Sequence, residues 1–199
     1  MMKKIGFVLG LMVCSMQGFA YYANDYVVPK EGFVPRAEIV QALAHAYLNH
    51  LYFSDYYQQN MVELDDLVVK SKGDTWAVSH QDRLVMRLRK DNGAVLFIAT
   101  FETHRVRADV EREGMVFSES LALAIAKIIW LDIYGKEVLE KMPYRLLGKE
   151  ISGESGKIWF IEGTLPEVKR DGIILSSGGV PYLKVRQRDG AILGVFHDE

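Results

Sequence analysis

The chain has 199 residues, of which 49% are hydrophobic, and its formal net charge is −2. This length and hydrophobicity suit one compact core or two small ones. The weakly acidic balance argues against nucleic-acid binding, which usually requires a dense basic stripe.

The first 20 residues have the three parts of a cleavable secretory signal peptide. Lys3 and Lys4 supply positive charge, residues 5–13 are almost wholly apolar, and Gly18-Phe19-Ala20 is a small-x-small cleavage site. The apolar run is too short to span a bilayer. We therefore expect cleavage after Ala20, export to the periplasm and no membrane attachment of the mature chain.

A lipoprotein signal is the weaker alternative. Cys14 follows Leu11 at the spacing of a lipid-attachment site, but Val13 precedes it where Gly, Ala or Ser is normal. Cleavage after Ala20 would remove this only Cys, so no intramolecular disulfide is expected. It would also leave 22 basic and 26 acidic residues, a net charge of −4.

After the signal, the first half of the chain reads as one helix followed by strands. Pro35 suits a first helical turn, and apolar residues from Ile39 to Leu51 keep the three-or-four spacing of a half-buried helix. Short apolar or alternating segments then predict strands at residues 62–69, 75–78, 84–89 and 95–101. Asn92-Gly93 indicates a two-residue hairpin turn between the last two.

The second half has the same order of elements. Ser118 is a suitable N-cap, and the helix at residues 121–134 is too apolar for a surface helix, so it should lie deep against a sheet and end at Gly135. Strands are predicted at residues 144–147, 158–162, 182–187 and 192–197. Asp189-Gly190 again indicates a two-residue turn.

This common order reflects an internal repeat. Residues 31–34 return at 113–116 with an offset of 82, residues 73–78 at 156–161 with an offset of 83, and residues 88–96 at 185–193 with an offset of 97. The repeat predicts an α+β fold of two tandem units, each a helix on one face of an antiparallel sheet. We place the units at residues 21–109 and 110–199, after a signal peptide at residues 1–20.

The sequence offers a poor case for catalysis. The mature chain has no Cys, and His45 and His50 are five apart, which misses the i, i+4 register that converges on a metal. Asp65-Asp66 is better explained as a solvated turn than as an acid–base pair. No catalytic residue, metal site or cofactor is predicted, and the protein is expected not to be an enzyme.

The growing offset marks an extra loop in the second unit, at residues 165–179. It carries both signs of charge and an apolar segment, Ile173-Ile174-Leu175. Long loops with apolar residues often bind a partner. Alternatively, residues 173–175 form a short strand that covers the edge of the sheet.

Residues 110–199 resemble the small immunity proteins of bacterial polymorphic toxin systems, which have the nuclear transport factor 2-like (cystatin-like) fold. Several segments carry the resemblance, the third and fourth being the most specific: Glu113-Gly114-Met115-Val116, Ile133-Tyr134-Gly135, Trp159-Phe160-Ile161-Glu162-Gly163-Thr164-Leu165-Pro166, Gly178-Gly179-Val180-Pro181-Tyr182 and Asp189-Gly190-Ala191-Ile192-Leu193. The first unit lacks both specific segments, since residues 79–82 bridge its strands directly. The resemblance therefore implies that the first unit is a degenerate copy of the second, which completes the packing.

The resemblance implies that the protein neutralises a cognate toxin by tight binding. The residues it marks for partner binding are Trp159, Glu162, Thr164, Leu165, Pro166, Gly178, Gly179, Pro181 and Tyr182. Two other functions stay open: a periplasmic protease inhibitor of the PepSY type, which Tyr182-Leu183-Lys184-Val185 would also fit, and a small-ligand binding module. The sequence also leaves the oligomeric state open, a homodimer included.

Overall fold

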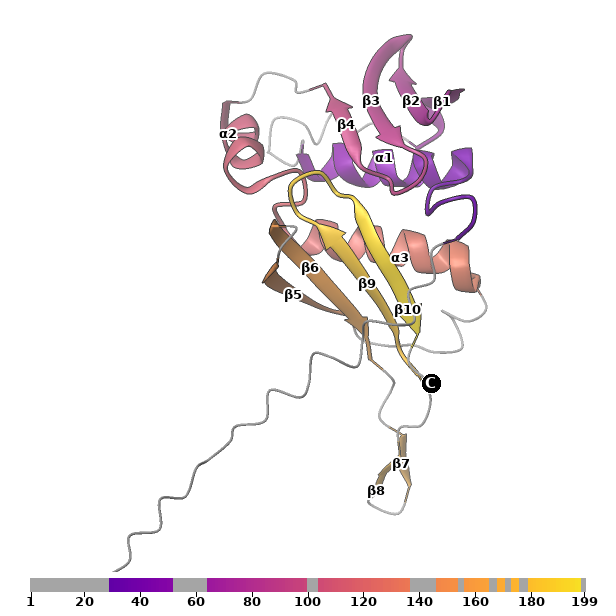
Figure 1. Ribbon diagram of the computed structural model, residues 1–199, viewed down its shortest axis with the longest axis vertical. Coiled ribbons are helices and arrows are strands. Elements are labelled where there is room, and N and C mark those ends of the chain that lie inside the picture. Colours follow the sequence, from indigo (N-terminus) through magenta and orange to yellow (C-terminus); the bar gives the residue numbers. More distant parts are fainter. Residues whose placement is uncertain are drawn as a thin grey trace, which may run out of the picture.

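The computed structural model describes residues 29–51, 64–99, 104–136, 146–153, 156–164, 168–170, 173–175 and 179–197. The predicted signal peptide and Cys14 lie outside these ranges. The described residues form two tandem units, each with a helix and a four-stranded antiparallel sheet (Figure 1). The predicted α+β fold is confirmed, and the two sheets are separate.

The first unit contains helix α1 (Ala37–Leu51), a short 3-10 turn η2 (Leu64–Asp66) and a sheet with the strands in chain order. These are β1 (Leu67–Lys72), β2 (Thr75–His80), β3 (Arg83–Arg89) and β4 (Val95–Ile98). Helix α2 (His104–Glu113) leads to the second unit.

The second unit contains helix α3 (Glu119–Tyr134) and a sheet of order β5-β6-β9-β10. Its strands are β5 (Leu146–Gly153), β6 (Gly156–Gly163), β9 (Pro181–Arg186) and β10 (Ile192–His197). Between β6 and β9 the chain forms a separate hairpin, β7 (Val168–Arg170) and β8 (Ile173–Leu175). The extra loop therefore has the position that the repeat predicts.

Helix α3 begins and ends as its sequence predicts. The Ser118 hydroxyl accepts a hydrogen bond from the Leu121 N–H, and the Gly135 N–H donates to the Leu131 carbonyl at a φ of 80°. Leu121, Ile125 and Ile129 are all buried, at the spacing of one helical face. The helix packs against β5, β6 and β9, so the predicted position deep against the sheet is confirmed.

Both units share one hydrophobic core. Helix α1 packs on β1 and β2, α3 packs on the second sheet, and the two helices also pack against each other (Figure 1). The ring of Tyr47 on α1 and that of Trp130 on α3 are fully buried in this region. Arg36, before α1, forms an ion pair with Asp132 on α3.

The two tryptophans occupy equivalent places. Trp76 Nε1 donates to the Val34 carbonyl at 2.8 Å, and Trp159 Nε1 donates to the Val116 carbonyl at 2.7 Å. In both units the indole therefore ties the second strand to the segment that precedes the helix.

The hairpins of the two units also bond to each other, in a reciprocal way. The Val95 N–H donates to the Asp189 carbonyl and the Ile192 N–H donates to the Asn92 carbonyl, each at 2.8 Å. Because Val95 corresponds to Ile192 and Asn92 to Asp189, exchanging the two units leaves this pattern unchanged. The units thus meet through matching surfaces, as two subunits of a symmetric dimer do.

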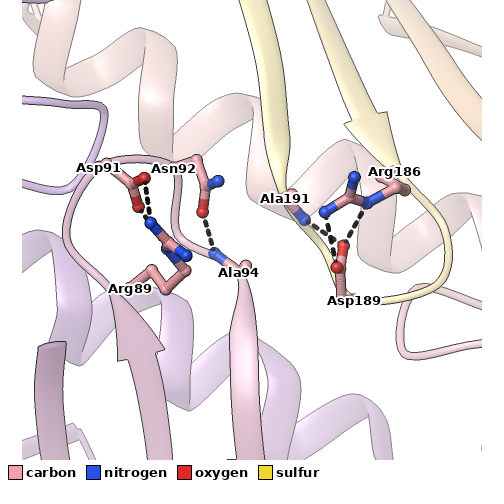
Figure 2. Close-up of polar contacts among 7 residues, drawn as sticks. All are labelled: Arg89, Asp91, Asn92, Ala94, Arg186, Asp189 and Ala191. Carbon is pink, nitrogen blue, oxygen red and sulfur yellow. Dashed lines mark hydrogen bonds and ion pairs between the residues drawn. The ribbon is translucent and has the colours of Figure 1, made fainter. Parts of the chain in front are cut away.

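The prediction of two-residue hairpin turns is wrong in length. The Arg89 N–H donates to the Ala94 carbonyl and the Arg186 N–H to the Ala191 carbonyl, so each pair closes a loop of four residues. Gly93 and Gly190 take positive φ at the end of these loops. A side-chain hydrogen bond favours the longer loop. The Asn92 side-chain oxygen accepts from the Ala94 N–H, two residues further along the chain (Figure 2).

Several elements differ from the prediction, β1, β5 and α2 the most, and β4 ends at Ile98 instead of residue 101. β5 runs to Gly153, well beyond residue 147, because its exposed edge position leaves its residues without an apolar pattern. β1 begins at Leu67, after the 3-10 turn, instead of at residue 62. Helix α2 was not predicted because it is short and mostly charged, with only Val106, Ala108 and Val110 as apolar residues.

Candidate interaction surface

The second sheet has one face on the core and one face turned away from it. Ile161, Leu183 and Val195 are fully buried in the core. Side chains alternate along a strand, so Phe160 and Tyr182, their neighbours, lie on the opposite face. We call this face of the second sheet the aromatic face.

Three stacked rings form its centre. Tyr182 and Phe196, directly paired on β9 and β10, have ring centroids 4.7 Å apart and planes 8° from parallel. Phe160 lies 5.5 Å from Tyr182, at 28°. Stacked aromatic pairs contribute about 0.5–1.5 kcal/mol beyond the area they bury. Tyr182 and Phe196 lie outside the main core but are themselves buried, at 8% and 5% exposure, so the stack is a fixed support and not an exposed contact surface.

Charged groups border the rings. Lys184 Nζ lies 5.8 Å from the Phe160 centroid and 5.9 Å from the Phe196 centroid, within the range of cation–π attraction. Glu162 Oε1 accepts from Lys149 Nζ at 3.2 Å. The aromatic face therefore presents charged groups around a largely buried aromatic stack.

Most of the predicted binding residues that the structure describes gather at one end of this face. Glu162 is on β6, Thr164 follows β6, Gly179 precedes β9, and Pro181 and Tyr182 begin β9. The strand register pairs Glu162 with Tyr182 directly. Leu165, Pro166 and Gly178 lie outside the described residues.

Trp159 is the exception among the predicted residues. Its side chain belongs to the hydrophobic core, is 7% exposed and donates to the Val116 carbonyl. An inward ring with a buried hydrogen bond suits a structural role, and the prediction of Trp159 as a contact residue stays a prediction. The sequence pattern could not show which face of the strand it occupies.

The apolar segment of the loop does form a short strand. β8 pairs with β7 and not with either four-stranded sheet, so it does not cover a sheet edge as one alternative expected. Figure 1 shows the β7–β8 hairpin projecting from the end of the second sheet, away from both helices. A hairpin in this position lies next to the end of the aromatic face where β6 ends and β9 begins.

Sequence reasoning missed the residues that complete the aromatic face. Phe160, Lys184, Phe196 and Lys149 join it only through the pairing of β5, β6, β9 and β10. The long insertion between β6 and β9 hides this register in the sequence. Alternation within β6 was the one signal that could have separated outward Phe160 from inward Trp159.

The groups considered for chemistry have ordinary surroundings. His45 lies 2.9 Å from the Asn49 side chain, and the His50 ring donates to the Ala46 carbonyl one helical turn away. Asp65 and Asp66 are exposed in the 3-10 turn, as the solvated-turn interpretation predicts. In the described part of the chain, no three His, Cys, Asp or Glu side chains converge as metal ligands would.

A comparison with protein families gives one match, to the second unit. Residues 121–199 match the family of NTF2 fold immunity proteins. The match covers α3 and all four strands of the second sheet, and it confirms the resemblance predicted from the sequence over those residues. It supports an immunity function in general, and with it a toxin as the general kind of partner.

The other comparisons add no relative. Neither the curated proteins nor the solved structures contain a match to the chain. Within the ranges that the structure describes, no helix is long and apolar enough to cross a membrane.

Proposed function

We propose that the protein is an exported immunity protein that neutralises a cognate bacterial toxin by binding it, without catalysis. The observation that carries the proposal is the family match over residues 121–199. The predicted signal peptide at residues 1–20 would bring the protein to the periplasm, where it would meet the toxin. The first unit would be a degenerate copy of the second.

The toxin would bind at the end of the aromatic face from which the β7–β8 hairpin projects. Glu162, Thr164, Pro181 and Tyr182 lie there, and the predicted residues of the loop adjoin them in sequence. Tyr182 and Phe196 are buried, so their stacked rings would hold the strand ends rigid behind the partly exposed Glu162 and Thr164, and a rigid site loses little conformational entropy on binding. Trp159 would support the strand from the core side.

The first test measures protection of living cells. A toxin encoded next to this gene is directed to the periplasm, with and without the full-length protein. We expect growth only when the protein is present, and no protection when residues 1–20 are removed and the toxin acts in the periplasm. Equal survival with and without the protein, for every co-encoded toxin, contradicts the proposal.

The second test addresses the loop, and the first unit supplies the design. There the equivalent strands, β2 and β3, are joined by the two-residue turn Gln81-Asp82, with φ of 49° and 61°. Replacing residues 164–180 by this turn should leave the fold intact, because the same strand pair closes that way in the first unit. We expect unchanged thermal unfolding and loss of protection. Full protection by this variant would show that the loop is not part of the toxin-binding site.

A further inference from the structure

The first sheet also has an outer face, and its composition differs from that of the aromatic face. Val78, Met86 and Leu88 point into the core, so Ala77, Ser79 and Arg87 point outward; Val85, at an irregularity of β3, is also buried in the core. The register aligns these outward residues in three rows: Val68–Ser79–Leu84, Lys70–Ala77–Arg87–Phe97 and Lys72–Thr75–Arg89. We call this surface the basic face.

No row of the basic face contains an acidic residue, although the chain as a whole has a net charge of −2. Arg89 is neutralised by Asp91 in the adjacent turn, at 2.7 Å. Lys70, Lys72 and Arg87 form no ion pair with any described residue. The face therefore carries positive charge that the fold itself does not balance.

Arg87 is the most informative of these residues. It lies in the middle row, half-buried between Ala77 and Phe97, and its Nε is buried without a hydrogen-bond partner. A buried donor without an acceptor costs free energy in the isolated protein. That atom is closed to solvent, so a partner carboxylate would instead pair with the charge of the Arg87 guanidinium, which no described residue balances.

The same face exposes large apolar side chains. Val68 is 50% exposed, Leu84 37% and Phe97 43%, and Leu96, at the irregularity in β4, is 54% exposed. Among the described residues only Leu131, on α3, is a comparably exposed large hydrophobic. Apolar exposure concentrated on one face beside unbalanced charge indicates an interaction surface.

We propose that the basic face binds an acidic surface of a protein partner, with a carboxylate against Arg87 and apolar side chains against Leu84 and Phe97. This inference rests on the proposed function, so the partner is the toxin, which would contact the basic face in addition to the end of the aromatic face. A second copy docked through the same face would bring two positively charged surfaces together, so like-charge repulsion opposes it. An anionic membrane is less well matched, since the surface lies on a sheet with small Ala77 and Ser79 at its centre and is not the apolar side of an amphipathic helix.

The test measures the Kd of the full chain for the co-encoded toxin by calorimetry, at low and at high salt. Arg87→Gln should weaken binding about 30-fold, because it leaves the toxin carboxylate unpaired, and should reduce the salt dependence. Phe97→Ala should weaken it about tenfold. The matched controls are Lys127→Gln, which removes an exposed charge on α3, and Leu131→Ala, which removes an apolar side chain of equal exposure. Both controls should stay within about twofold of wild type.

Each outcome decides the proposal. If Arg87→Gln and Phe97→Ala fold normally and bind like wild type, the basic face is not the contact, while the proposed function stands. If wild type does not bind the toxin at all, the proposed function fails and this inference fails with it. If Arg87→Gln instead abolishes binding to phosphatidylglycerol vesicles and leaves the toxin Kd unchanged, the face belongs to a membrane contact and the proposal is overturned.

Discussion

Gly190 lies where the hairpin of the second unit meets helix α1 of the first. A Cβ added there would overlap with the Tyr47 hydroxyl, and the φ of 71° is one that only Gly adopts without strain. Tyr47 is fully buried and has no room to move aside without disturbing the packing between the units. This contact makes the position sensitive to a single methyl group.

Gly190→Ala should therefore lower the free energy of unfolding by about 2–4 kcal/mol, since it adds a steric clash to the backbone strain. The matched control is Gly73→Ala, where φ is 59° but no atom lies within 4 Å of the added Cβ. That change should cost only about 1 kcal/mol. Urea unfolding of both variants measures the difference; equal losses would show that Tyr47 does not press on the hairpin.

Asp189 both pairs with an arginine and accepts a backbone N–H of its own turn, whereas in the first unit two residues share these contacts (Figure 2). Its carboxylate accepts from Arg186 at 2.8 and 2.7 Å and from the Ala191 N–H at 3.1 Å. In the first unit Asp91 accepts from Arg89, and Asn92 accepts from the Ala94 N–H. Burial raises the pKa of Asp189, but the hydrogen bonds from Arg186 and Ala191 and the charges of Arg186 and Arg188 together lower it below its ordinary value.

This shift predicts a pH dependence of stability. Because the folded state holds the pKa of Asp189 below its unfolded value, the stabilisation is fully present above the unfolded pKa of about 4 and is lost as the pH falls through the folded value. Asp189→Asn should keep the bond to Ala191, as Asn92 does in the first unit, and lose the ion pair. It should cost about 1 kcal/mol at neutral pH and progressively less below about pH 4.

Unfolding of Asp189→Asn across pH tests this expectation, with Asp91→Asn as the control. The Asp91–Arg89 pair is more exposed to solvent, so its loss should matter less. A pH-independent difference between wild type and Asp189→Asn would show that the carboxylate charge contributes nothing.

At the scale of elements, each tryptophan strand is tied to a helix entry by one hydrogen bond. Trp159→Phe should destabilise the protein by about 1–3 kcal/mol, because the Val116 carbonyl stays buried without its donor. Trp76→Phe should cost less, since Trp76 is only half-buried and water can replace its bond to Val34. Thermal unfolding of the two variants checks this order; a larger loss for Trp76→Phe would contradict it.

The elements show how far the sequence predicts the fold. Helix α3 was predictable to its ends, because Ser118 and Gly135 mark them and the apolar spacing marks its face. The edge strand β5 and helix α2 were not, because β5 lies at the sheet edge without an apolar pattern and α2 contains only three apolar residues. The repeat predicted the order of strands and the place of the insertion.

The candidate surface was predictable only in part. The resemblance placed Glu162 and Tyr182 near one another, and the structure pairs them directly. It also selected Trp159, whose ring lies inward, and missed Phe160 and Phe196, whose rings stack with Tyr182. A single sequence does not give the register between two strands that a long insertion separates. Only the structure therefore shows on which side of the sheet each of these side chains lies.

At the scale of the whole molecule, the two units are one body with a shared core. The helices pack together, the hairpins exchange hydrogen bonds, and Tyr47 of one unit lies against Gly190 of the other. We expect a single cooperative unfolding transition, with helix signal and tryptophan fluorescence changing together. Two separate transitions would show that the units are stable independently.

This rigid two-unit body would neutralise its toxin by occupying it, and an inhibitor of that kind is consumed mole for mole. The decisive measurement is a titration of the activity of the purified co-encoded toxin with the full chain at concentrations well above the Kd. Our account predicts that activity falls linearly to zero at a fixed molar ratio and returns when the toxin is released from the complex. Lasting inactivation of the toxin by a small molar fraction of this protein would show turnover and contradict the account.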